Sequence, residues 1–215
     1  MNRLTQIANE CQTDKGFNKD ECHGYTEHYE YWLSKFTNPK ILEIGSWHGA
    51  STKMFNEYYN HNCDIWTFDI SYLEYWYEDQ PNVHKFQGNQ DNINCWTDFL
   101  AEADTKFDII IDDGSHEPKH QMHTLFWLHN QLNPNGIYIL EDLHTYSWDK
   151  LTNSPLYFLN FWNTDNEYLT NEQYNILKNS IKDETIIHIN NPKNQYGGFS
   201  ITSILRFKLW QTINL

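Results

Sequence analysis

The sequence has 215 residues and a formal net charge of −14, so it offers no basic face for phosphates and nucleic acid is not an expected partner. Its length suits one α/β domain with a substantial core, and we expect a single domain over residues 1–215. The first residues lack an apolar leader segment and no window reaches the length of a membrane span, which predicts a cytoplasmic protein without membrane contact.

Short apolar runs alternate with longer segments along the chain. Strands are predicted at Lys40–Ser46, Asp64–Ile70, Val83–Gln87, Asp108–Asp113, Ile137–Asp142, Glu184–Asn190 and Ser200–Lys208. Apolar residues at helical spacing predict helices at Ala50–Tyr59 and Lys119–Leu132, the second followed by the turn sequence NPNG. We therefore expect an α/β protein with a doubly wound, Rossmann-like sheet of seven mostly parallel strands.

The last two predicted strands are separated only by residues 191–198, which read NPKNQYGG. This interval is too short for a crossover helix, so we expect a hairpin and an antiparallel last strand. A parallel sheet that ends in this way is typical of the class I methyltransferase fold, whereas a dinucleotide dehydrogenase would continue with parallel units.

Residues 145–183 form an insertion rich in asparagine and aromatic residues, which we interpret as a substrate lid. A capping box at Thr170–Gln173 predicts the start of a helix inside it. Its aromatic residues could stack on a sugar or belong to the core, and both readings stay open: Trp148, Phe158, Phe161 and Trp162.

A glycine loop, Gly45-Ser46-Trp47-His48-Gly49, follows the first predicted strand and leads into a helix. Gly45 and Gly49 let the backbone approach a ligand closely, but the GxxxG spacing argues against the pyrophosphate of a dinucleotide. Asp69 closes the second strand, where an acid grips ribose hydroxyls in nucleotide-binding sheets. Further candidates for the same ligand are Glu43 for a cationic end, Asn89 and Gln90 for an adenine edge, and the loop residues Ser46 and Ser51. Ribose, adenine and a cationic end together describe S-adenosylmethionine.

Two other strands end in pairs of acids that are each followed by a histidine. Asp108–Asp113 reads DIIIDD before His116, and Ile137–Asp142 reads IYILED before His144. Unpaired buried carboxylates are costly, so acids at the ends of neighbouring strands suggest a shared cation. Oxygen ligands without cysteine favour Mg²⁺, with Mn²⁺ or Ca²⁺ as alternatives.

Successive side chains of a strand point to opposite faces, so Asp112 and Asp113 cannot both reach one ion. We assign Asp113 to the metal and Asp112 to the methionine end of the cofactor or to the loop backbone. His116 stands three residues beyond Asp113, where it could remove a proton from a hydroxyl near neutral pH. The alternative that these acids cap helices or pair with Lys119 and Lys150 stays open.

Several motifs resemble, in order along the chain, those of the metal-dependent sugar O-methyltransferases that act on macrolide antibiotics of the mycinamicin and tylosin type. They are TDKG, HGYTEHYE, ILEIGSWHGAS, TFDI, GNQD, DIIIDDGSHEPKHQ and YILEDLHTYSW, and they cover roughly residues 12–148. The DDGSH and EDLHT blocks are the specific part. The resemblance implies that Asp113, Glu141 and Asp142 bind Mg²⁺ and that His116 is the catalytic base.

The same resemblance implies that residues 1–38 form an N-terminal helical cap over the cofactor, with Lys15 and Tyr25 in contact with it. We therefore expect a Mg²⁺-dependent O-methyltransferase that moves a methyl group from S-adenosylmethionine to a hydroxyl of a sugar in a glycoside, polysaccharide or glycosylated metabolite. Assembly as a homo-oligomer is compatible with this expectation. Two alternatives stay open: a catechol-like enzyme for a non-sugar vicinal diol, and a non-catalytic protein that binds S-adenosylmethionine.

Overall fold

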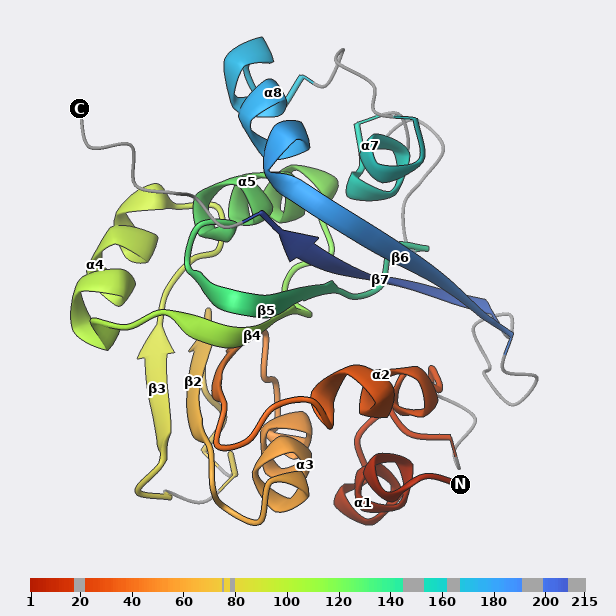
Figure 1. Ribbon diagram of the computed structural model, residues 1–215. Coiled ribbons are helices and arrows are strands. Elements are labelled where there is room, and N and C mark those ends of the chain that lie inside the picture. The colour runs from red at the N-terminus through yellow and green to blue at the C-terminus, as the bar shows by residue number, and fades with distance from the viewer. Residues whose placement is uncertain are drawn as a thin grey trace.

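A seven-stranded sheet forms the centre of the computed structural model, which describes residues 1–17, 22–74, 76–77, 80–144, 153–161, 167–190 and 199–208. The strands follow the order β3-β2-β1-β4-β5-β7-β6 (Figure 1). Their bounds are β1 Lys40–Ile44, β2 Asp64–Asp69, β3 Val83–Gln87, β4 Phe107–Asp112, β5 Leu132–Leu140, β6 Ile181–Asn190 and β7 Phe199–Phe207. The helices are α1 Arg3–Cys11, α2 Thr26–Leu33, α3 Ala50–Tyr58, α4 Ile93–Ala103, α5 Pro118–Leu128, α7 Pro155–Phe161 and α8 Asn171–Ser180.

The first five strands pair in parallel, and β7 pairs antiparallel with both β5 and β6. This confirms the predicted doubly wound sheet with an antiparallel last strand. The connection between β6 and β7, residues 191–198, lies outside the described residues. All five parallel strands end at the same edge, so the loops that follow them meet there.

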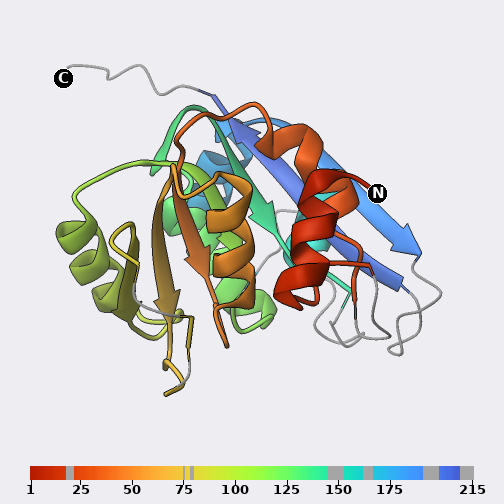
Figure 2. The same ribbon diagram turned by 90° about the horizontal axis from the view of Figure 1, so that it is seen from below.

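Helices cover both faces of the sheet. Figures 1 and 2 show α1, α2 and α3 on one face, and α4, α5, α7 and α8 lie on the other. Alternation along β4 supplies both cores, since Ile110 packs with the second group of helices while Ile109 and Ile111 pack with the first. None of the helices in the described ranges is long and apolar enough to cross a membrane.

The boundaries between α5 and β5 differ from the predicted ones. Helix α5 ends at Leu128, and β5 begins at Leu132, so the expected NPNG turn lies within the bounds of the strand. The pairing of β4 with β5 is irregular between Phe107 and Ile109, and Asn135 has a positive φ of 67°. The NPNG sequence therefore forms a local irregularity within the first half of β5, and it is not the loop that joins α5 to β5.

The segment expected as a lid contributes to the core. Phe158 of α7 and Tyr174 of α8 are buried and meet edge to face in the cluster that also contains residues of α5. The capping box at Thr170 and Gln173 is present. Residues 145–152 and 162–166, which include Trp148 and Trp162, lie outside the described residues. In the described part of the segment, no residue lines the cleft at the strand ends.

Gly45 holds the ends of three strands together. Its N–H donates to Phe68 O of β2 at 2.9 Å, and its φ is +78°. A Cβ atom at this position would lie 2.1 Å from the carbonyl oxygen of Asp113. We expect Gly45→Ala to destabilise the protein by about 2–4 kcal/mol. Alanine is strained in the left-handed backbone conformation, and its Cβ atom would clash with the carbonyl oxygen of Asp113. Urea unfolding measures this change, and Gly136→Ala, which has no positive φ, should cost less.

Candidate active site

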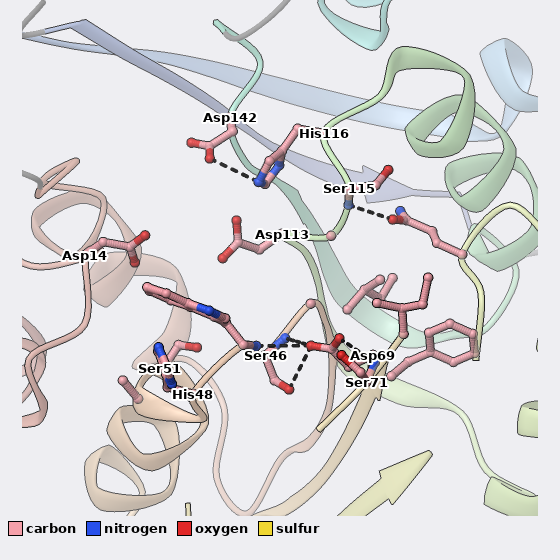
Figure 3. Close-up of a pocket in the computed structure, with 18 of the residues that line it drawn as sticks. Asp14, Ser46, His48, Ser51, Asp69, Ser71, Asp113, Ser115, His116 and Asp142 are labelled. Carbon is pink, nitrogen blue, oxygen red and sulfur yellow. Dashed lines mark hydrogen bonds and ion pairs between the residues drawn. The ribbon is translucent and has the colours of Figure 1, made fainter. Parts of the chain in front are cut away.

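A cleft of about 750 Å³ opens at the carboxyl ends of the parallel strands. Its walls come from the glycine loop after β1 and from the loops after β2, β3, β4 and β5 (Figure 3). Nine of the residues predicted for cofactor, metal or catalysis line it: Gly45, Ser46, Ser51, Asp69, Asn89, Gln90, Asp113, His116 and Asp142. The carboxyl edge of a parallel sheet is the usual ligand position in such folds.

Six predicted residues do not line the cleft: Lys15, Tyr25, Glu43, Gly49, Asp112 and Glu141. Glu43 is fully buried and accepts a hydrogen bond from the Thr52 hydroxyl, and burial raises its pKa to about 7. Gly49 has a φ of +75° and precedes α3. Both residues thus lie outside the cleft wall, and the contact between Glu43 and a cationic ligand stays a prediction.

Asp69 fixes the glycine loop. Its Oδ2 atom accepts from the Ser46 N–H at 2.7 Å, the Trp47 N–H at 3.0 Å and the Ser46 hydroxyl at 3.2 Å. Its Oδ1 atom accepts from the Ser71 N–H at 3.2 Å. Figure 3 shows this carboxylate beneath the loop at the floor of the cleft. The residue lies where a ribose-binding acid was predicted, and in the structure it also shapes the loop.

Gln90 joins two walls of the cleft. Its Nε2 atom donates to Asp112 Oδ1 at 2.9 Å, and its Oε1 atom accepts from the Ser115 N–H at 2.9 Å. Both ends of this amide are thus occupied, which limits the predicted role in reading an adenine edge. Asp112 is fully buried, and burial raises its pKa to about 7. The separation of Asp112 from the cleft agrees with the alternation of side chains along β4.

Asp113, His116 and Asp142 come together on the opposite side of the cleft from Asp69. One potential ligand atom from each lies within 4.8 Å of the others, and Figure 3 shows the three side chains pointing toward one another. His116 Nε2 is 3.5 Å from Asp142 Oδ2. His116 and Asp142 both have positive φ, 57° and 56°. Such left-handed backbone is uncommon for residues other than glycine and concentrates at functional sites.

Glu141 turns away from this group toward the N-terminal part of the chain. Its Oε2 atom accepts from Lys15 Nζ at 2.6 Å, and its Oε1 atom accepts from the Tyr29 hydroxyl at 3.1 Å. The same Lys15 Nζ is 2.5 Å from Asp113 Oδ2. Lys15 therefore contacts two of the three predicted metal ligands, and its contact with the cofactor stays a prediction.

Tyr25 and His23 hold Asp142. The Tyr25 hydroxyl donates to Asp142 Oδ1 at 2.6 Å, and His23 Nδ1 lies 3.8 Å from the same oxygen. The rings of Tyr25 and His23 stack with their centroids 5.0 Å apart. His144 Nδ1 lies 4.0 Å from Asp142 Oδ1 and accepts a hydrogen bond from the Ile201 N–H at 3.3 Å. Tyr25 thus orients a carboxylate, and its contact with the cofactor stays a prediction.

Charge and burial shift the pKa values of the acids in opposite directions. Burial raises the pKa of Asp113 to about 6, although Lys15 opposes this shift. Burial would also raise the pKa of Asp142, but the neighbouring His23 and His116 and the hydrogen bond from Tyr25 outweigh it and lower the value. Asp142 is therefore ionised near neutral pH, whereas burial disfavours the charged form of Asp113.

The residues present fit a hard divalent cation. Asp113 and Asp142 supply carboxylate oxygens within reach of one another, and a cation would relieve the crowding of charge that helps to raise the Asp113 pKa. Lys15 already places one positive charge against Asp113 and Glu141. No cysteine belongs to the group, which agrees with oxygen-preferring ions.

Sequence reasoning left Tyr29 and His23 without a role. Both belong to the HGYTEHYE motif, in which only Tyr25 was given a predicted role. Tyr29 is fully buried, and His23 is nearly so. Trp47 and Asp14 also line the cleft, and the Trp47 side chain is 71% exposed. Trp47 could have been predicted at the cleft because it lies within the GxxxG loop. Asp14 could not, because it reaches the cleft only when the N-terminal segment folds against the strand ends.

The order of this sheet, its antiparallel last strand and the glycine loop above Asp69 define the class I methyltransferase fold. Residues 42–143 match the family model described as a methyltransferase domain, Methyltransf_24. The matched stretch begins in β1 and ends in the loop after β5, so it includes Asp69, Asp113, His116 and Asp142. Over this stretch, the chain is similar to that family of methyltransferase domains.

The chain is similar to three curated enzymes. It is 31% identical over 135 residues to demethylmacrocin O-methyltransferase from Streptomyces fradiae, covering 59% of this chain and 33% of that relative. It is 30% identical over 135 residues to mycinamicin VI 2''-O-methyltransferase from Micromonospora griseorubida, with the same two shares. It is 30% identical over 142 residues to 8-demethyl-8-alpha-L-rhamnosyl tetracenomycin-C 2'-O-methyltransferase from Streptomyces olivaceus, covering 62% and 36%. The match thus spans about a third of the length of these relatives.

These relatives confirm the predicted resemblance to sugar O-methyltransferases of the macrolide type. The fold also agrees with a solved structure, that of MycE methyltransferase from the mycinamycin biosynthetic pathway in complex with Mg, SAH and mycinamycin VI. Its TM-score is 0.73 at 21% identity, and the alignment covers 100% of this chain and 57% of that one. A likeness at this identity establishes the common fold.

Proposed function

We propose that this chain forms the catalytic domain of a Mg²⁺-dependent O-methyltransferase that transfers a methyl group from S-adenosylmethionine to a hydroxyl of a sugar. The observation that carries the proposal is the convergence of Asp113, His116 and Asp142 on the wall of the cleft that faces Asp69. The names of the relatives support the sugar acceptor, and the Mg and SAH held by MycE support the two cofactors.

The floor of the cleft would hold the methyl donor. A cleft of about 750 Å³ falls within the range that encloses small ligands and cofactors. Gly45 and Ser46 bring backbone close to its base, and Asp69 lies where ribose hydroxyls bind in nucleotide-binding sheets. Asn89 lies beside them, on the loop after β3. Donor and acceptor would thus meet between the glycine loop and the acid group.

Asp113 and Asp142 would hold the divalent ion, with Glu141 behind Asp113 as the third acid of the cluster. A divalent ion bound there supplies Lewis acidity, which lowers the pKa of an acceptor hydroxyl. Asp142 is held in place for this task by Tyr25, whose hydroxyl donates to it at 2.6 Å. The carboxylates would also fix the acceptor between the base and the methyl donor.

His116 would accept the proton of the acceptor hydroxyl at Nε2. This atom faces Asp142 Oδ2, whose negative charge stabilises the imidazolium that results. The buried Nδ1 of the same ring has no hydrogen-bond partner among the described residues. As the proton leaves, the acceptor oxygen forms a bond to the methyl carbon and the bond from that carbon to sulfur breaks, so the sulfonium becomes the thioether of S-adenosylhomocysteine.

Substrate profiling of the purified protein tests this proposal. With S-adenosylmethionine and Mg²⁺, we expect methylation of deoxysugar glycosides such as rhamnosides and at least about tenfold lower kcat/KM for catechol, because the relatives are named for sugar positions. Mass spectrometry of the acceptors measures both. Methylation of catechol alone would favour an enzyme for non-sugar diols, and calorimetric binding of S-adenosylmethionine without turnover on any acceptor would favour a binding protein.

A further inference from the structure

Lys15 inserts a positive charge among the predicted metal ligands. Its Nζ atom lies 2.5 Å from Asp113 Oδ2 and 2.6 Å from Glu141 Oε2. The side chains of Lys15 and Glu141 are both 1% exposed, so water does not screen the contact between them. The lysine is far from both acids in the sequence, and only the folding of the N-terminal segment brings it there.

The backbone around Lys15 fixes the position of this ammonium group. The carbonyl oxygen of Lys15 accepts from the N–H of Thr26 at 3.1 Å and from its hydroxyl at 3.2 Å. The N–H of Lys15 donates to the Thr13 hydroxyl at 3.4 Å. Lys15 is thus anchored to the start of α2, and its side chain leaves a fixed point toward the acids. A surface lysine that pairs by chance would lack these constraints.

Lys15 can offset only part of the charge of this acid cluster. Asp113, Glu141 and Asp142 would together carry three negative charges if all were ionised. Lys15 offsets one of them, and the two that remain equal the charge of a divalent ion.

We propose that Lys15 is a built-in cation of this acid cluster, which shares Asp113 and Glu141 with the divalent ion and weakens the binding of that ion. The inference rests on the proposed function, because it assumes that the same acids bind a metal. Lys15 keeps the cluster assembled before a divalent ion arrives, since it forms ion pairs with Asp113 and with the buried Glu141. Its charge repels the incoming ion across a short distance, and so keeps the ion exchangeable.

Lys15→Met tests the inference through metal binding and unfolding, without the need for turnover. Calorimetric titration with Mg²⁺ should give a dissociation constant at least about tenfold lower in Lys15→Met than in the wild type, because a like charge has been removed. Thermal unfolding should show a lower Tm for the metal-free variant and a larger rise of Tm on addition of Mg²⁺ than in the wild type. If Lys15 had a purely structural role, Lys15→Met would instead leave the Mg²⁺ affinity unchanged or reduce it.

Two variants control for charge and fold. Lys15→Arg retains the positive charge and should bind Mg²⁺ like the wild type. Lys40→Met removes a charge at the opposite end of β1, where the exposed Lys40 contacts Thr105, and should also leave Mg²⁺ affinity unchanged.

Equal or weaker Mg²⁺ binding by Lys15→Met, or a variant that stays unfolded at saturating Mg²⁺, would overturn the role of Lys15. If the wild type binds Mg²⁺ and methylates its acceptor in that case, the proposed function stands and only the inference fails. If neither protein binds Mg²⁺, the metal-dependent function fails together with the inference.

Discussion

His116→Ala is expected to lower kcat for methyl transfer by about 10²- to 10⁴-fold, the usual contribution of a general base. The substitution removes the imidazole whose Nε2 atom faces Asp142 Oδ2 at the rim of the cleft. Binding of S-adenosylmethionine should remain nearly unchanged, because the glycine loop and Asp69 do not touch this imidazole. Initial rates with a saturating sugar acceptor measure the first effect, and isothermal titration with S-adenosylhomocysteine measures the second.

A matched substitution separates the loss of the base from a loss of fold. His84→Ala also removes an imidazole, but His84 pairs with Asp64 away from the strand ends that form the cleft. It should retain wild-type kcat. Unchanged turnover in His116→Ala would remove this histidine from the mechanism, and a joint loss of turnover and cofactor binding would point to a structural role for its loop.

The sheet could be predicted from sequence because its strands are buried on both sides. Mainly apolar runs such as Ile41 to Ile44 and Ile109 to Ile111 are not expected at an exposed surface. Both runs are fully or almost fully buried in the structure. The short interval before β7 likewise required antiparallel pairing, which is observed. Hydrophobic pattern and connection length are local properties of the sequence, and these two were enough to predict the fold class.

Boundaries failed where pairing overrides local turn chemistry. Asn135 does adopt a positive φ, as a turn sequence favours, but Leu132 still pairs with Phe107 of β4. Strand β6 begins at Ile181 in place of Glu184, directly after α8, and its register shifts between Ile181 and Asp183. Both cases are irregular strand ends, whose extent depends on the neighbouring strand and not on the residues alone.

The location of the site was predicted more accurately than the contacts of its side chains. The position of the acids at neighbouring strand ends followed from topology, and Asp113, His116 and Asp142 do meet there. The alternation that separated Asp112 from Asp113 also separates Glu141 from Asp142, and this step was not applied to the second pair. Glu141 points toward Lys15 and Tyr29. These partners come from distant parts of the chain, so no spacing rule could have indicated them.

Chelation of divalent ions with EDTA is expected to reduce methylation by at least about 100-fold, and added Mg²⁺ should restore it. Asp113 and Asp142 hold negative charge beside the base, and without a divalent ion the acceptor hydroxyl keeps its ordinary, high pKa. The His116 imidazole alone is too weak a base to ionise such a hydroxyl near neutral pH. The rate of methyl transfer before EDTA, after EDTA and after excess Mg²⁺ measures the effect.

Asp142→Asn distinguishes a bound ion from a structural effect of the chelator. The amide is nearly isosteric and can still accept the hydrogen bond from Tyr25, so the fold should be retained while one charged ligand is lost. We expect this variant to need a higher Mg²⁺ concentration for half-maximal activity, whereas a purely structural carboxylate would leave that concentration unchanged. Activity of the wild type that is indifferent to EDTA would assign Asp113 and Glu141 to their ion pairs with Lys15 alone, because a cluster held only by an ammonium group has nothing for a chelator to remove.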